Sequence, residues 1–579
     1  MKTLLPLFSF LFIASFADAS TPVQADREPE AATGRYQQSL VEAEHFMVSA
    51  AHPLASKAGL RILQQGGSAM DAAIAVQLVL GLVEPQSSGI GGGAFILHWD
   101  QQQQQMTSFD GRETAPAAVD ETLFMQGDQA MAWREANVGG KSVGVPGLFA
   151  AMQQAHQRYG VLPWAALFQD AITLAEDGFE VSHRLARQLA SGWNQGLQHS
   201  EEAMAYFFPN GEALQAGQQL KNPAYAAILR QVAAEGAEVF YQGDNAKALV
   251  SAVQQAPVNP GQLSTADLLA YQVVEREPVC GAYRGYRVCG MAPPSSGGIA
   301  VLQILGILEA FELANYAPDS VEAIHLFAMA SQLAFADRDH YVADSDFVKV
   351  PVAQLLAPDY LQSRSQLLTL ERALQQVAPG EFGAEWSRQT TYSPELAATT
   401  HFSVVDAAGN AVSLTSSIEN VFGSGLMVNG YLLNNQLTDF SLNPKSDGAF
   451  VANRVEPGKR PRSSMAPVMV FDAEGQLRMV LGSPGGSRII NYVAHTLVAL
   501  IDWQLDIQSA MNLSRVTHRN DFLALEKGTE LEQRQAALQQ LGHQVRVIDL
   551  NSGLHGIVLL ESGLQGGADP RREGQVLGH

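Results

Sequence analysis

The segment SAMDAAIAVQLVLGLVEP, from Ser68 to Pro85, is almost entirely apolar. Serine is a preferred residue before the first turn of a helix, and proline cannot continue one, so the segment predicts a helix bounded by these two residues. A helix that is apolar all round must be covered on most sides. The chain therefore has to build a thick interior around it.

The composition supports such an interior. The chain has 579 residues, of which 46% are hydrophobic and 16% charged, so it can bury a large core. We find no Pro- or Ser-rich linker and no fixed-period repeat, which favours one large domain or two intimate layers. The formal net charge of −22 repels phosphate backbones and anionic lipid heads. We therefore do not expect the protein to bind nucleic acid.

The first residues, MKTLLPLFSFLFIASFADAS, have the features of a secretory signal. Lys2 precedes an apolar run from Leu4 to Phe16, and small residues follow at 17–19. We predict cleavage after Ala19 and export to the periplasm or the medium. The run is short for a membrane span, although an uncleaved anchor is the alternative, and no later segment is a membrane candidate.

The two cysteines, Cys280 and Cys289, lie in VCGAYRGYRVCG. The alternation with Gly285 between them predicts a hairpin, and an exported protein can keep a disulfide. A disulfide and two separate buried thiols are both compatible with the sequence. Two cysteines cannot make a zinc site alone, and we find neither HExxH nor paired CxxC, so no metal is expected.

The order of predicted elements is helices, then strands, then strands and helices mixed. Antiparallel sheets between helical layers would accommodate this order. The string GIGGGA at residues 89–94 matches a dinucleotide-binding fingerprint by letters, but here a helix precedes it and a strand follows, the reverse of the required order. Acidic residues at 337, 339, 344 and 346 lack calcium-loop spacing, so we expect a solvated helix end and turn.

Two adjacent threonines, Thr399 and Thr400, open a predicted β-hairpin, THFSVVD-AAGN-AVSLTSS. If the peptide before a threonine is cut, the freed α-amine can take the proton of its hydroxyl and make it a nucleophile. A loose polar segment precedes the doublet and would allow such a cut. A second doublet at 390–391 is followed by Pro394, which disrupts a strand. Strand preference alone would also explain the threonines.

Eight motifs, in order along the chain, resemble those of the γ-glutamyltranspeptidases, which are N-terminal-nucleophile hydrolases. These eight, which accompany the similar segment TTHFSVVDAAGNAV, are the segment from GGSAMDAA to GIGGGAF, GRETAP, GVPG, PPSSGG, LLNNQLTDF, KRPRSSMAP, GSPGGSRII and the terminal ADPRR. The resemblance covers essentially everything after the signal. It implies an α+β fold, a four-layer αββα sandwich with two stacked, mainly antiparallel sheets.

The resemblance also implies a maturation step and catalytic groups. The nucleophile is Thr399, the first of the doublet, with self-cleavage between Ala398 and Thr399. The products are a large chain, residues 20–398, and a small chain, residues 399–579, which form one intertwined catalytic domain as a heterodimer. The family has a second hydroxyl that bonds the nucleophile, usually threonine, and here Ser417 occupies that position. Gly485 and Gly486 correspond to the oxyanion hole.

Recognition of a γ-glutamyl head requires groups for its α-carboxylate and its α-ammonium. By the resemblance, Arg112 is the carboxylate clamp, a role that suits its planar fork, and Ser463 and Ser464 assist it. Gln436 and Asp439 face the ammonium.

Two departures from the family concern this pocket. Glu419 stands where many members have asparagine, which adds negative charge close to the site. Residues 440–463 look shorter than the stretch that forms a lid in several members, and a more open site is our expectation.

The implied activity is transfer of a γ-glutamyl group from glutathione or a related amide to water, amino acids or peptides, without a cofactor or metal. No membrane partner is expected after signal removal. The alternative is an acylase of the same superfamily acting on glutaryl amides such as glutaryl-7-aminocephalosporanic acid, a cephalosporin. A non-catalytic scaffold, such as a periplasmic binding protein, would not need Thr399, Ser417, Gly485 and Gly486 together.

Overall fold

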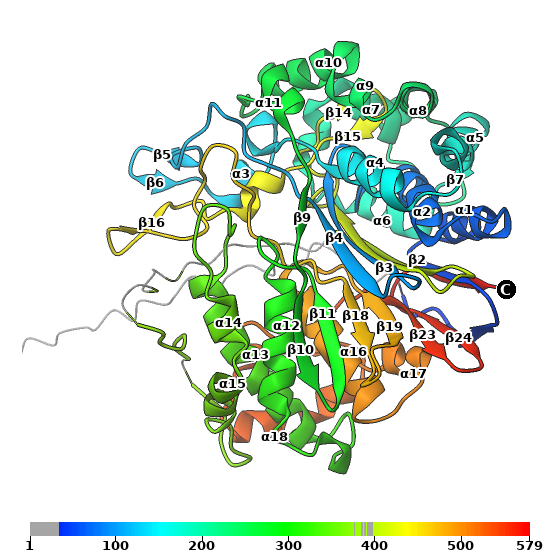
Figure 1. The fold of residues 1–579 in the computed structure, drawn as a ribbon. Coiled ribbons are helices and arrows are strands. Elements are labelled where there is room, and N and C mark those ends of the chain that lie inside the picture. Colours follow the sequence, from blue (N-terminus) through cyan, green and yellow to red (C-terminus); the bar gives the residue numbers. More distant parts are fainter. Residues whose placement is uncertain (1–33, 376, 384–385, 387–389, 391–397) are drawn as a thin grey trace, which may run out of the picture.

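The computed structural model describes residues 34–579 except 376, 384–385, 387–389 and 391–397. Two seven-stranded sheets lie face to face at its centre, and helices cover both outer sides (Figure 1). The predicted signal peptide, the second threonine of the 390–391 doublet and the residues directly before Ala398 lie outside the described residues.

The first sheet carries the predicted threonine hairpin at its centre. Every pair of neighbouring strands in it is antiparallel. Its strands, in spatial order, are β25 (Gln575–Gly578), β2 (Met47–Ala50), β12 (Thr400–Val405), β13 (Ala411–Ser417), β3 (Gly93–Asp100), β4 (Gln105–Gly111) and β9 (Val274–Arg276). The hairpin thus lies between β2 and β3 from the N-terminal part of the chain, and β25, near the C-terminus, is the next strand beyond β2.

The second sheet is also antiparallel throughout. Its strands, in spatial order, are β1 (Val41–Ala43), β24 (Gly563–Ala568), β23 (His555–Leu560), β19 (Leu477–Gly482), β18 (Val468–Phe471), β11 (Tyr286–Gly290) and β10 (Val279–Tyr283). β10 and β11 form the predicted cysteine hairpin, in which Cys280 pairs with Cys289 and a disulfide joins them. The two thiols are therefore bonded rather than separately buried.

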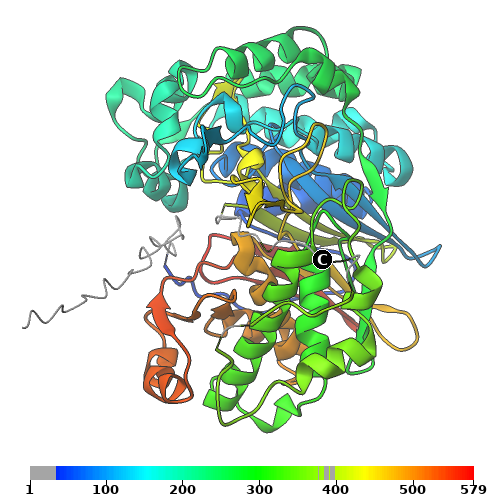
Figure 2. The ribbon, with the colours of Figure 1, turned by 90° about the vertical axis from the view of Figure 1, so that its left-hand side faces the viewer.

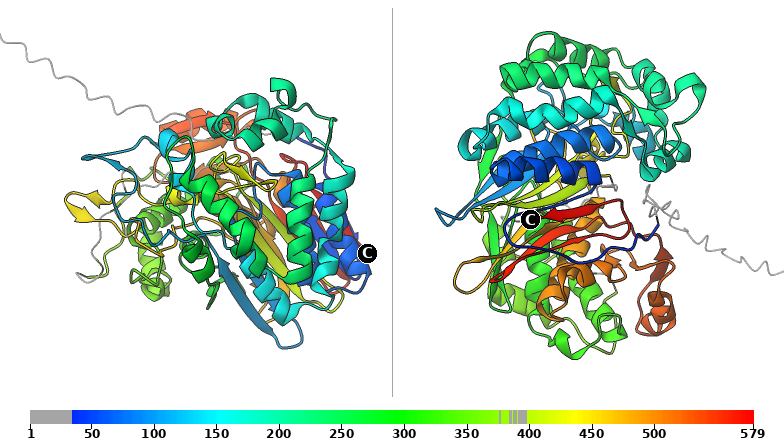
Figure 3. Two further views of the ribbon diagram at one scale, coloured as in Figure 1. Left: turned by 90° about the horizontal axis from the view of Figure 1, so that it is seen from above. Right: turned by 90° about the vertical axis from the view of Figure 1, so that its right-hand side faces the viewer.

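Helices form the two outer layers, which Figures 2 and 3 show from the side and from above. The first sheet is covered by α1 (Pro53–Gln64), α2 (Ala69–Val83) and α4 (Leu148–Tyr159), and α5 (Gln169–Asp177) and α8 (Pro223–Glu235) pack beyond them. The second sheet is covered by α12 (Gly297–Leu308), α16 (Ile489–Ile501) and α17 (Ile507–Asn512), with α13 (Val321–Tyr341) and α15 (Pro358–Ser365) packed on α12. Strands β12 and β13 contact β19 across the two sheets. The expected four-layer sandwich is confirmed.

Shorter elements fill the periphery of both halves. Around the first sheet lie α3 (Trp133–Ala136), α6 (His183–Ser191), α7 (Glu201–Phe207), α9 (Glu238–Tyr241), α10 (Gly243–Gln254), α11 (Thr265–Ala270), β5 (Met125–Gln126), β6 (Gln129–Ala130), β7 (Phe179–Glu180), β8 (Gln219–Leu220), β14 (Met427–Val428) and β15 (Tyr431–Leu432). Around the second lie α14 (Val352–Leu355), α18 (Gln535–Gln540), β20 (Val516–His518), β21 (Leu523–Glu526) and β22 (Val545–Ile548). A small hairpin, β16 (Lys445–Ser446) and β17 (Ala449–Phe450), projects within residues 440–463 (Figure 1).

The apolar helix of the sequence is α2, and it is buried as its composition requires. The Ser68 hydroxyl accepts from the Asp71 N–H, and the Asp71 carboxylate accepts from the Ser68 N–H, at 3.2 and 3.0 Å. This reciprocal capping satisfies two N–H groups that the first turn leaves free. α2 packs directly on β12 and β13. The helix therefore fixes the sheet that carries the threonine doublet.

The glycines of GIGGGA serve close packing rather than a phosphate. A Cβ at Gly92 would lie 2.2 Å from the carbonyl oxygen of Ser417, and a Cβ at Gly91 would lie 2.2 Å from that of Leu432. Only glycine allows such an approach. The turn therefore lets the start of β3 lie against the end of β13.

The expectation that the acidic residues at 337–346 form a solvated helix end and turn is wrong for two of them. Asp337 and Asp344 are buried, not solvated. The Asp337 carboxylate accepts from Gln303 Nε2 at 2.8 Å, and that of Asp344 accepts from the Arg460 N–H at 2.8 Å. Partners from distant segments explain the burial, because a buried carboxylate persists only when it is hydrogen-bonded or paired.

Candidate active site

Thr399 lies immediately before β12, opposite Ser417 at the end of β13. The register pairs Thr400 with Ser416, and the next residues, Thr399 and Ser417, join through their hydroxyls at 3.2 Å. Strand alternation separates the two threonines, because successive side chains point to opposite faces. The Thr399 side chain faces the second sheet and that of Thr400 faces the helices.

Ser417 links the threonine to the peptide bond before it. Its Oγ lies 2.9 Å from the carbonyl oxygen of Ala398 and 2.8 Å from the N–H of Glu419. A hydroxyl has one proton to donate and can accept twice. Ser417 can therefore donate to the Ala398 carbonyl while it accepts from both Thr399 and Glu419.

Gly485 and Gly486 form the turn between β19 and α16. Their φ angles are 133° and 57°, a region that favours glycine. They open a short 3₁₀ helix, Gly486–Arg488, and the first N–H groups of a helix have no partner within it. Gly486 lines the same pocket as Thr399. The turn can thus present N–H groups to an oxyanion at this pocket.

Arg112 and Asp439 form a buried ion pair, which the sequence did not predict. Arg112 Nη2 lies 2.5 Å from Asp439 Oδ2 and also donates to the carbonyl oxygen of Arg462 at 2.9 Å. Arg112 Nε donates to the carbonyl oxygen of Pro461. Arg112 is expected to bind the α-carboxylate of the substrate and Asp439 its α-ammonium. In the uncut chain these two side chains bind each other instead.

Gln436 and Glu419 border this pair. Gln436 Nε2 donates to Asp439 Oδ2 at 2.7 Å, and within the described part of the chain its Oε1 is buried without a hydrogen-bond partner. The Glu419 carboxylate accepts from Asn435 Nδ2. Gln436 Oε1 is thus an acceptor available to a bound cation.

Ser463 and Ser464 lie on the far side of the pocket, and Arg338 stands behind them. Arg338 Nη2 donates to Ser464 Oγ at 2.7 Å, and Arg338 Nε donates to Ser296 Oγ at 3.0 Å. Sequence reasoning missed Arg338. The available signal was a charged cluster, ADRD, at the end of a helix whose other residues are mostly apolar.

Glu113 is a second residue that sequence reasoning missed, although it follows Arg112 in GRETAP. Its carboxyl is fully buried, with Oε2 3.9 Å from Arg112 Nη1. Burial raises the pKa of Glu113 to about 8, although the Arg112 cation opposes the shift. Glu113 is therefore mainly uncharged at neutral pH, and Asp439 supplies the anion that pairs with Arg112.

Glu113→Gln should flatten the pH dependence of stability. The carboxyl has its raised pKa only in the folded state, so its contribution is fully present below about pH 4.5 and is lost as pH rises through about 8. With about 1.4 kcal/mol per unit of pKa difference, we expect wild type to lose roughly 3–5 kcal/mol more than Glu113→Gln between pH 4.5 and 8.5. Chemical denaturation at both pH values measures this.

Glu275→Gln is the matched control for that experiment, because Glu275 is partly exposed on β9 and pairs with Arg158 at the surface. It should follow wild type at both pH values. An equal loss in wild type and Glu113→Gln would show that the carboxyl is charged in the folded protein.

One pocket contains all but one of the predicted catalytic and substrate-binding residues, and the missing one, Gly485, is adjacent to Gly486. Its lining is Arg112, Thr399, Ser417, Glu419, Gln436, Asp439, Ser463, Ser464, Met465, Gly486 and Ile489. Its volume is about 20 Å³, whereas small-molecule sites usually measure ~300–1,000 Å³. The residues are therefore assembled, but the uncut chain leaves little room for a substrate.

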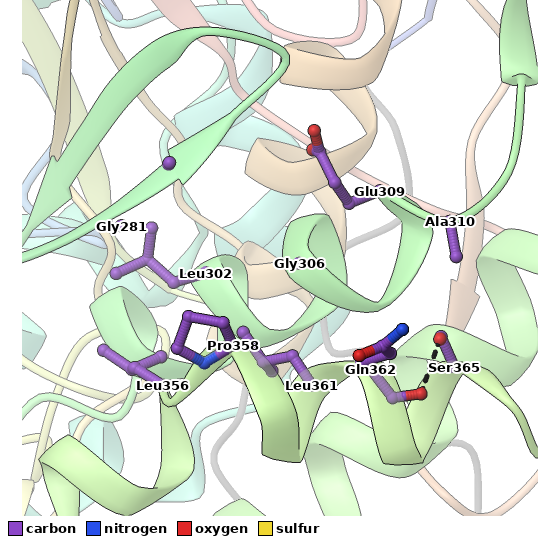
Figure 4. Close-up of a pocket in the computed structure, with 11 residues that line it drawn as sticks. Gly281, Leu302, Gly306, Glu309, Ala310, Leu356, Pro358, Leu361, Gln362 and Ser365 are labelled. Carbon is purple, nitrogen blue, oxygen red and sulfur yellow. Dashed lines mark hydrogen bonds between the residues drawn. The ribbon is translucent and has the colours of Figure 1, made fainter.

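A larger cavity, of about 420 Å³, lies between β10, α12 and α15 (Figure 4). Its floor is apolar, with Leu302, Leu356 and Leu361, and none of the predicted site residues lines it. It offers no nucleophile beside an oxyanion donor, so we do not assign the reaction to it.

The described residues contain no cluster of three or more His, Cys, Asp or Glu side chains suited to a metal ion. In the same residues, no helix has both the length and the apolar content needed to cross a membrane.

Comparison with known proteins matches most of the chain. The family model described as gamma-glutamyltranspeptidase matches residues 55–579. The glutathione hydrolase proenzyme of Escherichia coli K12 is 36% identical over 543 residues, 92% of this chain and 91% of the relative. The acylase ACY 1 proenzyme of Pseudomonas sp. SE83 is 36% identical over 532 residues, 90% of this chain and 91% of the relative.

Among solved structures, cephalosporin acylase from Bacillus halodurans superposes with a TM-score of 0.83. It is 29% identical and covers 97% of this chain and 99% of its own. The sandwich of two sheets is therefore shared over nearly the whole length.

Proposed function

Because the chain belongs to the γ-glutamyltranspeptidase family, we propose that it is a self-processing glutathione hydrolase and γ-glutamyltransferase. The observation that carries this function is a single pocket that joins a threonine hydroxyl, glycine N–H groups and a buried arginine–aspartate pair. The first two serve acyl transfer, and the pair complements a zwitterionic amino-acid head.

Maturation begins with Thr399. Its Oγ attacks the carbonyl carbon of Ala398 and its proton passes to the peptide nitrogen, so that the C–N bond breaks and the α-amine of Thr399 is freed. Water then cleaves the resulting ester, which releases the carboxylate of Ala398 and restores the Thr399 hydroxyl. The Ser417 hydroxyl, 2.9 Å from the Ala398 oxygen, can stabilise the negative charge that develops there. The products are chains 20–398 and 399–579, which remain together because β12 and β13 of the small chain pair with β2 and β3 of the large chain.

In the mature enzyme the α-amine accepts the proton of Thr399 Oγ, which attacks the γ-carbonyl carbon of the donor. The C–N bond breaks, and the amine leaves with a proton. Gly485 and Gly486 hold the oxyanion, and one such donor typically contributes ~2.7–4 kcal/mol. Water or an acceptor amine then releases the γ-glutamyl group from the threonine ester.

The donor's α-carboxylate meets Arg112, Ser463 and Ser464, with Arg338 holding Ser464. Its α-ammonium meets Asp439 and Gln436. The amino-acid head carries both a carboxylate and an ammonium, so it can bind between Arg112 and Asp439 and give each of them a new partner of opposite charge. Neither buried side chain is then left unpaired, which would be strongly unfavourable. Glu419 adds a further acceptor on the ammonium side. The pocket has to widen on maturation to admit this head.

The acylase alternative is favoured by two similarities, to the structure of cephalosporin acylase from Bacillus halodurans and to the sequence of acylase ACY 1. A glutaryl group has no α-ammonium, so an acylase would not require Asp439 and Gln436 on that side. The buried Arg112–Asp439 pair therefore supports the γ-glutamyl donor.

Export with signal cleavage after Ala19 is part of the proposal. It is consistent with the disulfide between Cys280 and Cys289, because such bonds persist outside the cytosol.

Incubation of purified mature protein with glutathione tests the function. We expect release of glutamate and cysteinylglycine, and a γ-glutamyl dipeptide when an amino acid is added as acceptor. A glutaryl anilide should be turned over at least about tenfold more slowly than the γ-glutamyl anilide, since a polar site rejects a substrate that leaves its buried groups unpaired. Faster turnover of the glutaryl anilide would establish the acylase instead.

A further inference from the structure

Arg572, in the terminal ADPRR, reaches the main chain of the nucleophile. Its side chain is fully buried, and Nη1 donates to the carbonyl oxygen of Thr399 at 3.2 Å. Its Nη2 lies 3.4 Å from the carbonyl oxygen of Asn551. The neighbouring Arg571 has a different role, because its guanidinium binds the carboxylates of Glu526 and Asp569.

Arg572 also borders the turn that carries the proposed oxyanion hole. A Cβ at Gly553 would lie 2.5 Å from Pro484 Cγ and 2.7 Å from Arg572 Cδ, so both side chains pack over the same glycine. Pro484 directly precedes Gly485 and Gly486. One arginine therefore lies between the nucleophile's main chain and the glycine turn.

We propose that Arg572 is a positioning residue that fixes the main chain of Thr399 and keeps its α-amine, once freed, in the uncharged form. The inference rests on the proposed function, in which that amine is the base. The amine and the carbonyl oxygen of one residue are roughly 3.5 Å apart by covalent geometry, so the guanidinium lies within about 7 Å of the amine. Arginine stays charged, and a like charge disfavours the ammonium form.

Two histidines pack near Thr399, but neither adds a positive charge beside that of Arg572. Burial holds the pKa of His401 well below its usual range and lowers that of His555 to about 4, so both rings are neutral near pH 7. Glu419, on the pocket side, acts in the opposite direction by favouring an ammonium. Arg572 offsets it.

Several ion pairs also lie close to the site. The Asp569 carboxylate is held by Arg571 and by Ser552 Oγ, at 3.0 and 2.5 Å. Arg112 pairs with Asp439, and Arg184 pairs with Glu84 at 2.6 Å. These pairs contribute little net field at the amine.

The pH profile of kcat/KM for a γ-glutamyl anilide tests the inference. In Arg572→Gln the acidic limb should move up by about one pH unit, because the amine gains protons more readily without the nearby cation. Arg572→Lys keeps the positive charge, so its acidic limb should lie at the same pH as that of wild type even if its kcat is lower. Arg478→Gln, which removes a partly exposed arginine at the start of β19, is the control and should not move it.

An acidic limb at the wild-type position in Arg572→Gln would overturn the inference. An equal shift in Arg572→Lys and Arg572→Gln would also overturn it, because packing rather than charge would then be the cause. Absence of a Thr399 N-terminus or of γ-glutamyl turnover in wild type would instead refute the proposed function.

A second measurement needs no variant, should Arg572→Gln fail to mature. Reductive ¹³C-methylation of the mature wild type labels the small-chain N-terminus, whose titration can be followed by NMR. We expect a pKa below the ordinary ~7.7–8.0 of an α-amine. A value within or above that range would overturn the inference.

Discussion

Thr399→Ala should leave the chain uncut and inactive. The substitution removes the atom that attacks the Ala398 carbonyl, so one band is expected on denaturing electrophoresis where wild type gives two. Turnover of a γ-glutamyl anilide should fall by about 10⁴-fold or more, the scale seen when a catalytic nucleophile is removed. Thr399→Ser keeps a hydroxyl and should retain slow maturation.

Thr400→Ala is the matched control for this prediction. Thr400 is the adjacent threonine, equally buried, but its hydroxyl faces the helices and has no hydrogen-bond partner in the described part of the chain. It should mature and turn over substrate like wild type. Two chains from Thr399→Ala, with the small one beginning at residue 399, would contradict the maturation mechanism.

Helices and hairpins that are specified by neighbouring residues could be predicted from the sequence. The apolar run after Ser68, the cysteine hairpin and the threonine hairpin all formed where the sequence indicated, because capping, alternation and turn residues act over a few positions. The length of a strand was harder to predict from the local sequence pattern. In the segment GYLLNN, residues 430–435, only Tyr431–Leu432 form a strand, because their partner β14 is itself only two residues long.

Pairings between distant segments could not be read from one sequence. The strand next to β12 is β2, whose other neighbour is β25, near the end of the chain. Nothing local in these four-residue strands selects that order. The same holds for the site, where Arg112 and Asp439 are 327 residues apart and Arg338 reaches Ser464 from another helix. The resemblance named Arg112 and Asp439 but not their contact.

Asp439→Asn should change which donors the enzyme prefers. The amide keeps the shape of the side chain but removes the anion that faces the donor's α-ammonium. Losing one partner of a buried charged contact typically costs ~2–5 kcal/mol, so kcat/KM for a γ-glutamyl anilide should fall by about 100-fold. A glutaryl anilide has no ammonium and should lose much less. The preference for γ-glutamyl over glutaryl should therefore collapse by one to two orders of magnitude, on the order expected from that contact.

The ratio of the two anilides is the informative quantity, because Asp439→Asn also leaves Arg112 buried without its carboxylate partner. That change can cost ~3–5 kcal/mol of stability and reduce the active fraction. A lower active fraction affects both substrates equally and cancels in the ratio. Asp244→Asn, at a fully exposed carboxylate on α10, should leave the ratio unchanged. An unchanged ratio in Asp439→Asn would mean that Asp439 only neutralises Arg112, and recognition of the ammonium would then have to rest on Glu419 and Gln436.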